Sequence, residues 1–359
     1  MVKDFSHLVR CYAEEFYIKK KLSRKNLNSE LNFSEELDNV RKILVIPSNA
    51  SGGILNSSYV VKMLKERYPS SEIRISIPNN WASVVTKFEG IDATISDWNS
   101  EYVWTKRYLS QIDSVSAWGP DLLIRLGTRA SLKENFGSVM IRAKLRLCYF
   151  PDDLTSEFWN FTLVKDIAGL SDFKCGTALM EVIGLKNDFQ SVNRTGAFKY
   201  VFGNEIPQNQ GISVAVDAEN LLISHGKNYF NDLIETLQSK NYKVVMILGL
   251  ARPSTVSYLI KMFGGTAVIH SATDMLSIGS VLLQCNASIC GVGDILHWSN
   301  AVGTPTICAA SDLSDCEITS FEEEGLLIDS SNKMFKDQLA LIMHKLEMSV
   351  NSENDLIQG

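Results

Sequence analysis

The chain has 359 residues, of which 45% are hydrophobic and 21% charged, and this composition is typical of a globular protein with two domains of ordinary size. Its net charge of −6 argues against nucleic acid or an anionic membrane as the main partner. The 7 cysteines include no Cys-x-x-Cys pair, and the 5 histidines lack metal-ligand spacing. We therefore expect free thiols in a reducing compartment and no metal site.

The N-terminus is charged throughout, which is unlike a secretory signal, and no apolar run is long enough for a transmembrane helix. We therefore expect a cytoplasmic protein. Residues 3–24 predict an amphipathic helix that includes Phe5, Tyr12 and Phe16 and ends in a basic run. Two interpretations stay open: cations suited to a helix C-terminus, or a surface helix that docks on a protein partner or on the inner face of the membrane.

From residue 41 onward, short apolar strands alternate with amphipathic helices. Such a pattern predicts an α/β fold whose parallel sheets are covered on both faces. After the first strand we expect a loop at 48–53 and a helix at 54–69. The expected strands are 42–47, 72–78, 92–96, 121–127 and 145–150, then 211–217, 242–249, 266–271 and 304–310, with a strand and turn at 287–294.

The stretch 151–210 is less regular, and its Gly, Pro, Asn and Gln content near 203–211 predicts a linker. Two Rossmann-like domains facing each other across a cleft would explain the similar layout of the two series. The predicted parts are an N-terminal helical extension at 1–40, a first domain at 41–203, a second at 204–331 and a C-terminal helix and tail at 332–359.

Four motifs carry a family resemblance: I-L-V-I (43–46) before a Gly-containing loop, K-M-L-K-E-R-Y-P (62–69), D-L-L-I-R-L (121–126) and H-W-S-N-A-V-G-T-P (297–305). They resemble the heptosyltransferases of bacterial cell-surface assembly, glycosyltransferase family 9, over most of residues 41–310. The resemblance implies a GT-B fold, an ADP-sugar bound mainly on the second domain and an acceptor on the first. It also implies an inverting transfer that needs no metal.

The polar positions of the family are not matched. Gly53 stands where the family has the aspartate expected as general base, and Val292 stands where a second aspartate opens an Asp-Ser-Gly turn. Asp294 is two residues away from the second position. The family's lysine aligns near Ile223, four residues before Lys227.

Sugar transfer requires a group that holds the departing diphosphate. The turn G-V-G-D (291–294) is the best candidate, because glycines let the backbone approach an anion and a helix N-terminus supplies N–H groups. Asp294 would suit a ribose hydroxyl better, and a helix cap or a tight turn is the structural alternative. Packing, capping or solvent exposure is likewise the alternative role of the other donor-site residues. The predicted donor-binding residues are Gly249, Arg252, Ser271, Gly291, Gly293, Asp294, His297 and Thr304.

A base must also take the proton of the acceptor. Asp152 and Asp153 in Y-F-P-D-D follow a first-domain strand, and either is a candidate catalytic base, with a capped or solvated turn as the alternative. The first loop contains no acid or base, so it can bind but not deprotonate an acceptor. The predicted acceptor-binding residues are Ser48, Asn49, Ser51, Gly52 and Gly53.

The leading interpretation is an inverting, metal-independent glycosyltransferase without a cofactor. It would move a heptose or hexose from an ADP-sugar or another nucleotide sugar to a glycan, lipid-linked or protein acceptor. The alternative, favoured by Gly53, is a catalytically inactive relative that serves as a binding or assembly subunit. A sugar-nucleotide epimerase is a third option, although it would need more carboxylates and histidines. No nucleic-acid partner is expected.

Overall fold

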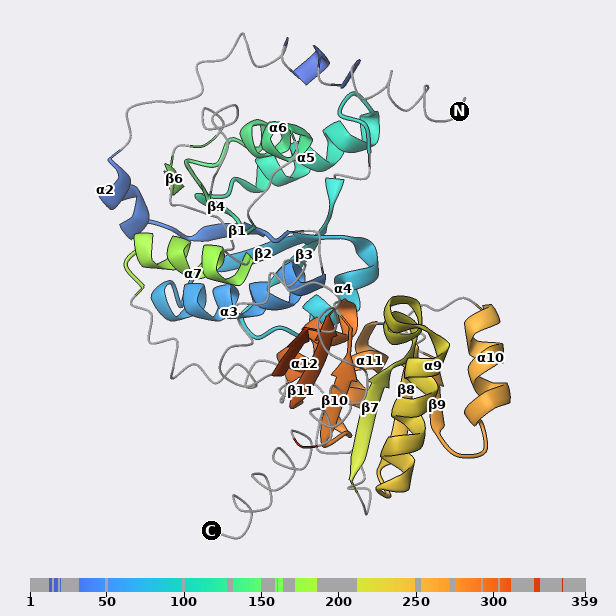
Figure 1. The fold of residues 1–359 in the computed structure, drawn as a ribbon. Helices are drawn as coiled ribbons and strands as arrows, with labels where there is room; N and C mark the ends of the chain where they lie inside the picture. Colours follow the sequence, from blue (N-terminus) through green and yellow to red (C-terminus); the bar gives the residue numbers. More distant parts are fainter. Residues whose placement is uncertain are drawn as a thin grey trace, which may run out of the picture. The chain divides into compact units, whose positions relative to one another are not determined.

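The chain divides into two compact units, Met1–Asp188 and Phe189–Gly359, each of which is described by itself (Figure 1). The predicted boundary at residues 203–204 lies outside the described residues. The computed structural model describes residues 13–14, 16–18, 20, 32–48, 51–98, 101–127, 132–149, 159, 161–163, 172–185, 212–248, 253–271, 275–291, 293–302, 304–310, 326–329 and 344.

Unit 1 is built on a 6-stranded sheet in the order β3-β2-β1-β4-β5-β6, and its neighbouring strands pair in parallel. The central strands are mostly apolar on both faces, because helices cover both sides of the sheet. The strands are β1 Lys42–Ile46, β2 Glu72–Ile77, β3 Ala93–Ser96, β4 Leu122–Arg125, β5 Leu145–Tyr149 and β6 Phe161–Leu163.

Two helix layers enclose this sheet. Helices α3 (Ser51–Arg67) and α7 (Asp172–Val182) pack against each other on one face, and α5 (Lys106–Trp118) and α6 (Leu132–Ile141) on the other (Figure 1). The first turn of α3 already contains residues 51–53, which the sequence had placed in a loop. The short elements are α2 Phe33–Asp38, a 3₁₀ turn at Asn79–Trp81 and α4 Ala82–Val85.

Part of the predicted N-terminal helix packs on unit 1. Ile18 is only 1% exposed, and Tyr17 lies edge-on against the rings of Phe136 and Trp104. The backbone N–H of Val103 donates to Glu14 Oε1 at 2.9 Å. These contacts give the described part of the segment a packing role within unit 1. Whether the helix also docks on a partner or a membrane stays a prediction.

A glycine inside α6 permits close packing of aromatic rings in unit 1. A Cβ at Gly137 would lie 2.5 Å from Trp98 Nε1 and 3.1 Å from the hydroxyl of Tyr108, and both rings are fully buried. We expect Gly137→Ala to lower the stability of unit 1 by about 1–2 kcal/mol, although alanine normally favours a helix. Urea unfolding followed by tryptophan fluorescence measures this, since Trp298 is the only tryptophan beyond residue 188. Ser110→Ala on the exposed side of α5 is the control, and an equally small effect of both changes would contradict the packing argument.

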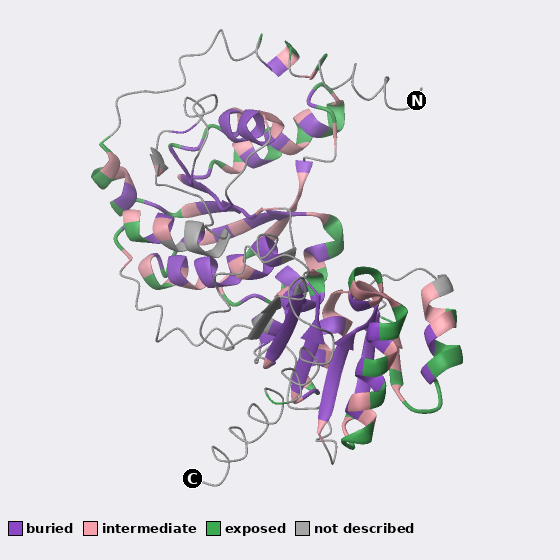
Figure 2. Cartoon of the chain, in the orientation of Figure 1, coloured by how far each residue is buried: buried purple, intermediate pink, exposed green. Residues whose placement is uncertain are grey.

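Unit 2 repeats the architecture of unit 1. Its 6-stranded sheet has the order β12-β11-β10-β7-β8-β9, and neighbouring strands again pair in parallel. The buried strand interiors of both units are visible in Figure 2. The strands are β7 Ser213–Asp217, β8 Lys243–Leu248, β9 Val268–Ser271, β10 Ala287–Cys290, β11 Thr306–Ala310 and β12 Leu326–Asp329.

Helix α9 (Ala218–Ser239) follows β7 directly and is interrupted at Gly226, whose φ of 81° and ψ of 171° are not helical. The second part of α9 carries an apolar stripe that includes Phe230, Leu233 and Leu237 and is buried with the strand residues Val214 and Val216 in one core. The remaining helices of this unit are α10 Pro253–Phe263, α11 Met275–Leu283 and α12 Asp294–Val302.

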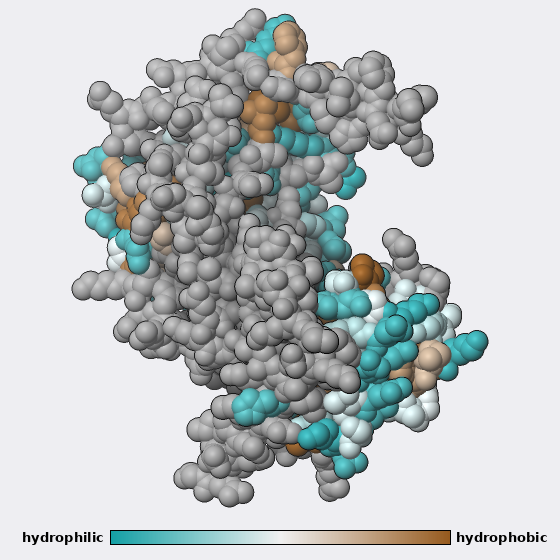
Figure 3. All heavy atoms as spheres, viewed as in Figure 1, coloured by the Kyte–Doolittle hydropathy of each residue, from teal (hydrophilic) through white to brown (hydrophobic). Residues whose placement is uncertain are grey.

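The described surface of unit 2 is largely polar in the view of Figure 3, with small separate apolar areas. Exposed large apolar side chains on this unit include Ile223, Ile260 and Val268. Among the described residues, no helix combines the length and apolarity that a membrane crossing demands.

Candidate functional site

The strand order places a topological switch point in each unit. Both sheets follow the doubly wound order, in which the first and fourth strands of the unit lie side by side and their connections leave toward opposite faces. Ligands of such sheets bind outside the carboxyl ends of the strands at this point. Each unit therefore has its own candidate site: the segments after β1 and β4 in unit 1, and the segments after β7 and β10 in unit 2.

In unit 2, the carboxyl end of β7 holds a buried acid that the sequence analysis did not single out. Asp217 is 1% exposed and caps α9 by accepting the backbone N–H of Asn220 at 3.2 Å. The Asn220 side-chain amide donates to the second carboxylate oxygen at 2.7 Å. The sequence does contain a signal for this residue. The apolar run G-I-S-V-A-V-D ends in an acid, which is a preferred residue for capping a helix that follows.

The electrostatics of this edge are unfavourable to a further negative charge. Burial raises the pKa of Asp217 to about 6, the hydrogen bonds from Asn220 oppose that rise, and the nearby carboxylates of Glu219 and Asp294 add to it. A diphosphate placed here would face the same repulsion. Carboxylates instead accept hydrogen bonds from hydroxyl groups, so this edge suits the sugar or ribose part of a ligand.

The two glycines of the predicted phosphate turn have a packing role in the chain itself. A Cβ at Gly291 would lie 3.0 Å from Asn220 Cβ, and one at Gly293 would lie 2.6 Å from Asn220 Nδ2. The Asn220 side chain thus lies beside both glycines, where the sequence analysis predicted a bound anion. Their contact with a donor stays a prediction.

The other described donor-site candidates do not all come together. Asp294 is exposed in the first turn of α12, and His297 is half-buried one turn later. Ser271 ends the edge strand β9 and is separated from β7 by β8. Thr304 precedes β11, at the amino edge of the sheet, and its hydroxyl donates to the Leu282 carbonyl at 2.9 Å. Only Asp294 and His297 therefore share the switch point with Gly291 and Gly293.

In unit 1, the predicted acceptor residues that the structure describes lie at the carboxyl end of β1. Ser48 follows the strand and is half-buried, and Gly52 and Gly53 are buried in the first turn of α3, which begins at Ser51. The first backbone N–H groups of a helix have no partner within the helix. The role of these residues in binding an acceptor stays a prediction, and no acid stands at the predicted base position, which is Gly53.

A buried ion pair lies beside this edge and was missed by the sequence analysis. Arg125 ends β4, is 2% exposed, and its Nη2 lies 3.6 Å from Glu134 Oε2 of α6. Its Nη1 also donates to the carbonyl of Gly127, a residue with a φ of 104°. The pair fixes the start of α6 relative to the strand. The sequence signal for this pair is the arginine in the apolar run D-L-L-I-R-L, because arginine is rarely buried unless it is paired.

Several predicted site residues lie outside the described part of the chain, and their roles stay predictions. These residues are Asn49, Asp152, Asp153, Gly249 and Arg252.

Among the described residues, no group of three or more His, Cys, Asp or Glu side chains could hold a metal ion.

Comparison with solved structures decides the fold. The E. coli heptosyltransferase WaaC with ADP matches with a TM-score of 0.68 and 12% identity, over 86% of this chain and 99% of that chain. The E. coli ADP-heptose lps heptosyltransferase II matches with a TM-score of 0.65 and 14% identity, over 87% and 99%. The chain has a GT-B-like fold.

A third solved structure, the glycosyl transferase family 9 from Veillonella parvula, matches this GT-B-like chain with a TM-score of 0.64 and 13% identity. The match covers 92% of this chain and 99% of that chain. No protein-family model and no curated protein matches the sequence. At sequence identities of 12–14%, these structural matches confirm the predicted fold. A shared fold does not by itself identify the donor, the acceptor or the reaction.

Proposed function

We propose that this chain is a glycosyltransferase that moves a sugar from a nucleotide-sugar donor to an acceptor hydroxyl, with inversion and without a metal. The observation that carries the proposal is the likeness of the chain to three glycosyltransferase structures over 99% of each of them. One of these contains ADP. The exposed carboxylate of Asp294 at the switch point of unit 2 supports the proposal as a group that can accept hydrogen bonds from hydroxyls of the donor.

In the proposed complex, unit 2 binds the donor and unit 1 the acceptor. The carboxylate of Asp294 accepts hydrogen bonds from ribose or sugar hydroxyls, and Arg252 holds the diphosphate. An acceptor oxygen bonds to the anomeric carbon while the bond to the diphosphate breaks, and Asp152 or Asp153 takes the acceptor proton. The nucleoside diphosphate leaves with the negative charge. A sugar phosphate ester, lipid-linked glycan or protein glycan would be an acceptor of the right class.

Donor binding is the first step that an experiment can isolate. Millimolar ADP, ADP-glucose and UDP-glucose are expected to raise the melting temperature of the full chain, because a ligand that binds only the folded state stabilises it. Asp294→Ala should weaken the affinity for the best nucleotide sugar by about tenfold through loss of a charged hydrogen bond. Asp232→Ala, at an exposed position of α9, is the matched control. Equal affinities of the two variants would contradict the hydroxyl-binding role of Asp294.

The catalytic step has its own test. Asp152→Ala and Asp153→Ala are expected to leave the thermal shift intact, and one of them should abolish sugar transfer. Full turnover in both variants would reject both aspartates as the base.

The second candidate is a binding or assembly subunit that has kept the fold and lost the reaction. Gly53 at the base position and Asn220 beside both glycines of the donor turn favour it. No thermal shift with any nucleotide or nucleotide sugar would decide in its favour.

A further inference from the structure

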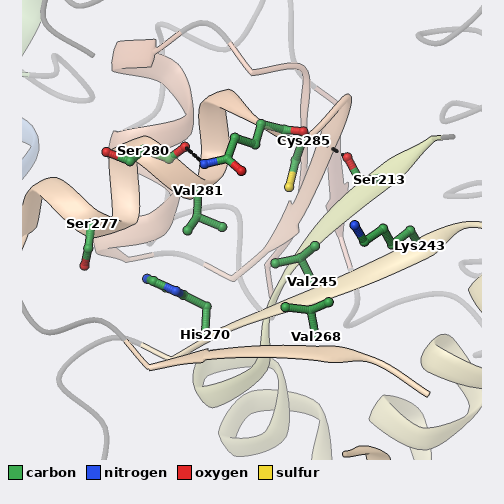
Figure 4. Close-up of a pocket in the computed structure, with 10 residues that line it drawn as sticks. Ser213, Lys243, Val245, Val268, His270, Ser277, Ser280, Val281 and Cys285 are labelled. Carbon is green, nitrogen blue, oxygen red and sulfur yellow. Dashed lines mark hydrogen bonds between the residues drawn. The ribbon is translucent and has the colours of Figure 1, made fainter. Parts of the chain in front are cut away.

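A cavity of about 470 Å³ lies in unit 2 between α11 and the strands β8 and β9 (Figure 4). Its floor includes Ser213 and Lys243, which pair at the start of β7 and β8, and Val245 and Val268, which pair between β8 and β9. The cavity thus extends to the amino ends of the strands, whereas the proposed donor site lies at their carboxyl ends. Its volume is within the range of sites for small molecules.

The side of α11 that borders the cavity is largely polar, whereas the buried side of the same helix carries Ile278 and Leu282. Ser277, Ser280 and Val281 stand at the spacing i, i+3 and i+4, and Gln284 follows the last residue of the helix at i+7, so the four border the cavity from one side. Figure 4 shows Val281 and Ser277 pointing toward the cavity above His270.

The donors of these groups are largely used within the protein, which leaves acceptors for a ligand. The Ser280 hydroxyl donates to the Leu276 carbonyl at 3.1 Å, and the Gln284 amide donates to the Ser280 carbonyl at 3.2 Å. The Ser213 hydroxyl donates to the Gln284 carbonyl at 3.0 Å. Lone pairs of the hydroxyl and amide oxygens remain, and these would accept hydrogen bonds from ligand hydroxyls.

Two other side chains of the cavity, Lys243 and His270, carry nitrogen atoms that can bind an anion or form a hydrogen bond. Lys243 has no ion pair among the described residues, and none of the residues lining the cavity is an acid. Within the described part of the chain, the buried Nε2 atom of His270 has no hydrogen-bond partner. A buried polar atom without a partner costs about 1–3 kcal/mol, and a bound ligand would remove that cost. Cys285 also lines the cavity, and burial raises the pKa of its thiol to about 11, so the thiol is uncharged at neutral pH.

We propose that this cavity binds a hydroxylated organic anion, namely a monosaccharide bearing a phosphate or a carboxylate. Lys243 pairs with the anionic group, His270 contributes a hydrogen bond, and the oxygens of the α11 face receive the sugar hydroxyls. The apolar face of the sugar ring lies on Val245 and Val268. This site is separate from the proposed donor site, and the proposal does not depend on sugar transfer.

Isothermal titration of the full chain tests the site with glucose 6-phosphate, glucuronate, glucose and inorganic phosphate at low ionic strength. We expect saturable binding of at least one sugar anion below about 10 mM, and at least about tenfold weaker binding of both glucose and phosphate. Lys243→Met should weaken sugar-anion binding by at least about tenfold. Lys261→Met, at an exposed position of α10 in the same unit, should leave it unchanged.

The same titrations define what overturns the proposal. No saturable heat with either sugar anion, phosphate binding as tight as that of the sugar anions, or unchanged affinity in a folded Lys243→Met variant would each do so. Ser280→Val provides a second probe of the hydroxyl-binding face if the lysine variant fails to fold, and wild-type affinity in it counts against the site. Competition with a nucleotide sugar would assign the binding to the proposed donor site instead. Glycosyl transfer can fail without affecting any of these readouts.

Discussion

Glu134→Ala is expected to lower the free energy of unfolding of unit 1 by about 3–5 kcal/mol, because it leaves a buried guanidinium without its carboxylate. Arg125 is 2% exposed and the Glu134 side chain 10%, so water cannot replace the lost partner. Urea unfolding at neutral pH, followed by tryptophan fluorescence, reports on unit 1.

An exposed ion pair of the same unit serves as the matched control. Lys144 Nζ lies 3.4 Å from Glu36 Oε2, and the two side chains are 58% and 29% exposed. Glu36→Ala should cost less than about 1 kcal/mol, since solvent screens such pairs. The double change Arg125→Met with Glu134→Leu should recover much of the loss, because no charge is left buried. Equal costs for Glu134→Ala and Glu36→Ala would refute the assignment of a buried pair.

Asp217→Asn is expected to stabilise the chain above pH 6, although it removes a charged hydrogen-bond acceptor. The folded pKa of about 6 lies above the ordinary value of 3.8, so between these values the folded state binds a proton that the unfolded state has released. Stability from this group is therefore greatest below about pH 4 and falls as the pH rises through 6. The full penalty is about 2–3 kcal/mol, and asparagine still caps the helix.

Thermal unfolding between pH 4 and pH 8 measures the difference between Asp217→Asn and the unmodified chain. The difference should be smallest near pH 4 and reach its plateau near pH 7, reduced by about 1 kcal/mol for the altered hydrogen bond to Asn220. Asp232→Asn, on the exposed side of the same helix, is the matched control. A constant difference for Asp217→Asn would show that its carboxyl titrates normally.

The periodicity of the sequence was enough to predict the α/β class and most strands. Largely apolar runs such as K-I-L-V-I-P and A-S-I-C are found as the buried strands β1 and β10, because burial on both faces of the sheet favours apolar residues. The helix that begins at Ser51 was placed three residues late. Glycine has poor helix propensity, so the sequence favours a loop at Gly52 and Gly53. Both residues are helical because α3 starts soon after β1 in the fold.

The site was less predictable than the fold because its contacts join distant parts of the chain. Asn220 meets Gly291 and Gly293 across the switch point, and Arg125 meets Glu134 between a strand and the next helix. Glycine in a turn has the same sequence signature whether a ligand or a neighbouring side chain lies beside it. Pattern analysis therefore predicted an anion beside these glycines and could not predict that Asn220 lies there.

The interruption at Gly226 has an evolutionary consequence for the edge it adjoins. Its backbone angles belong to a region that only glycine occupies readily, so the segment 218–225 and the long segment after it have separate axes. Changes of sequence between Leu221 and Gly226 would not rotate Phe230 and Leu233 out of the core. The surface of this short segment can thus vary while the core beneath it keeps its register.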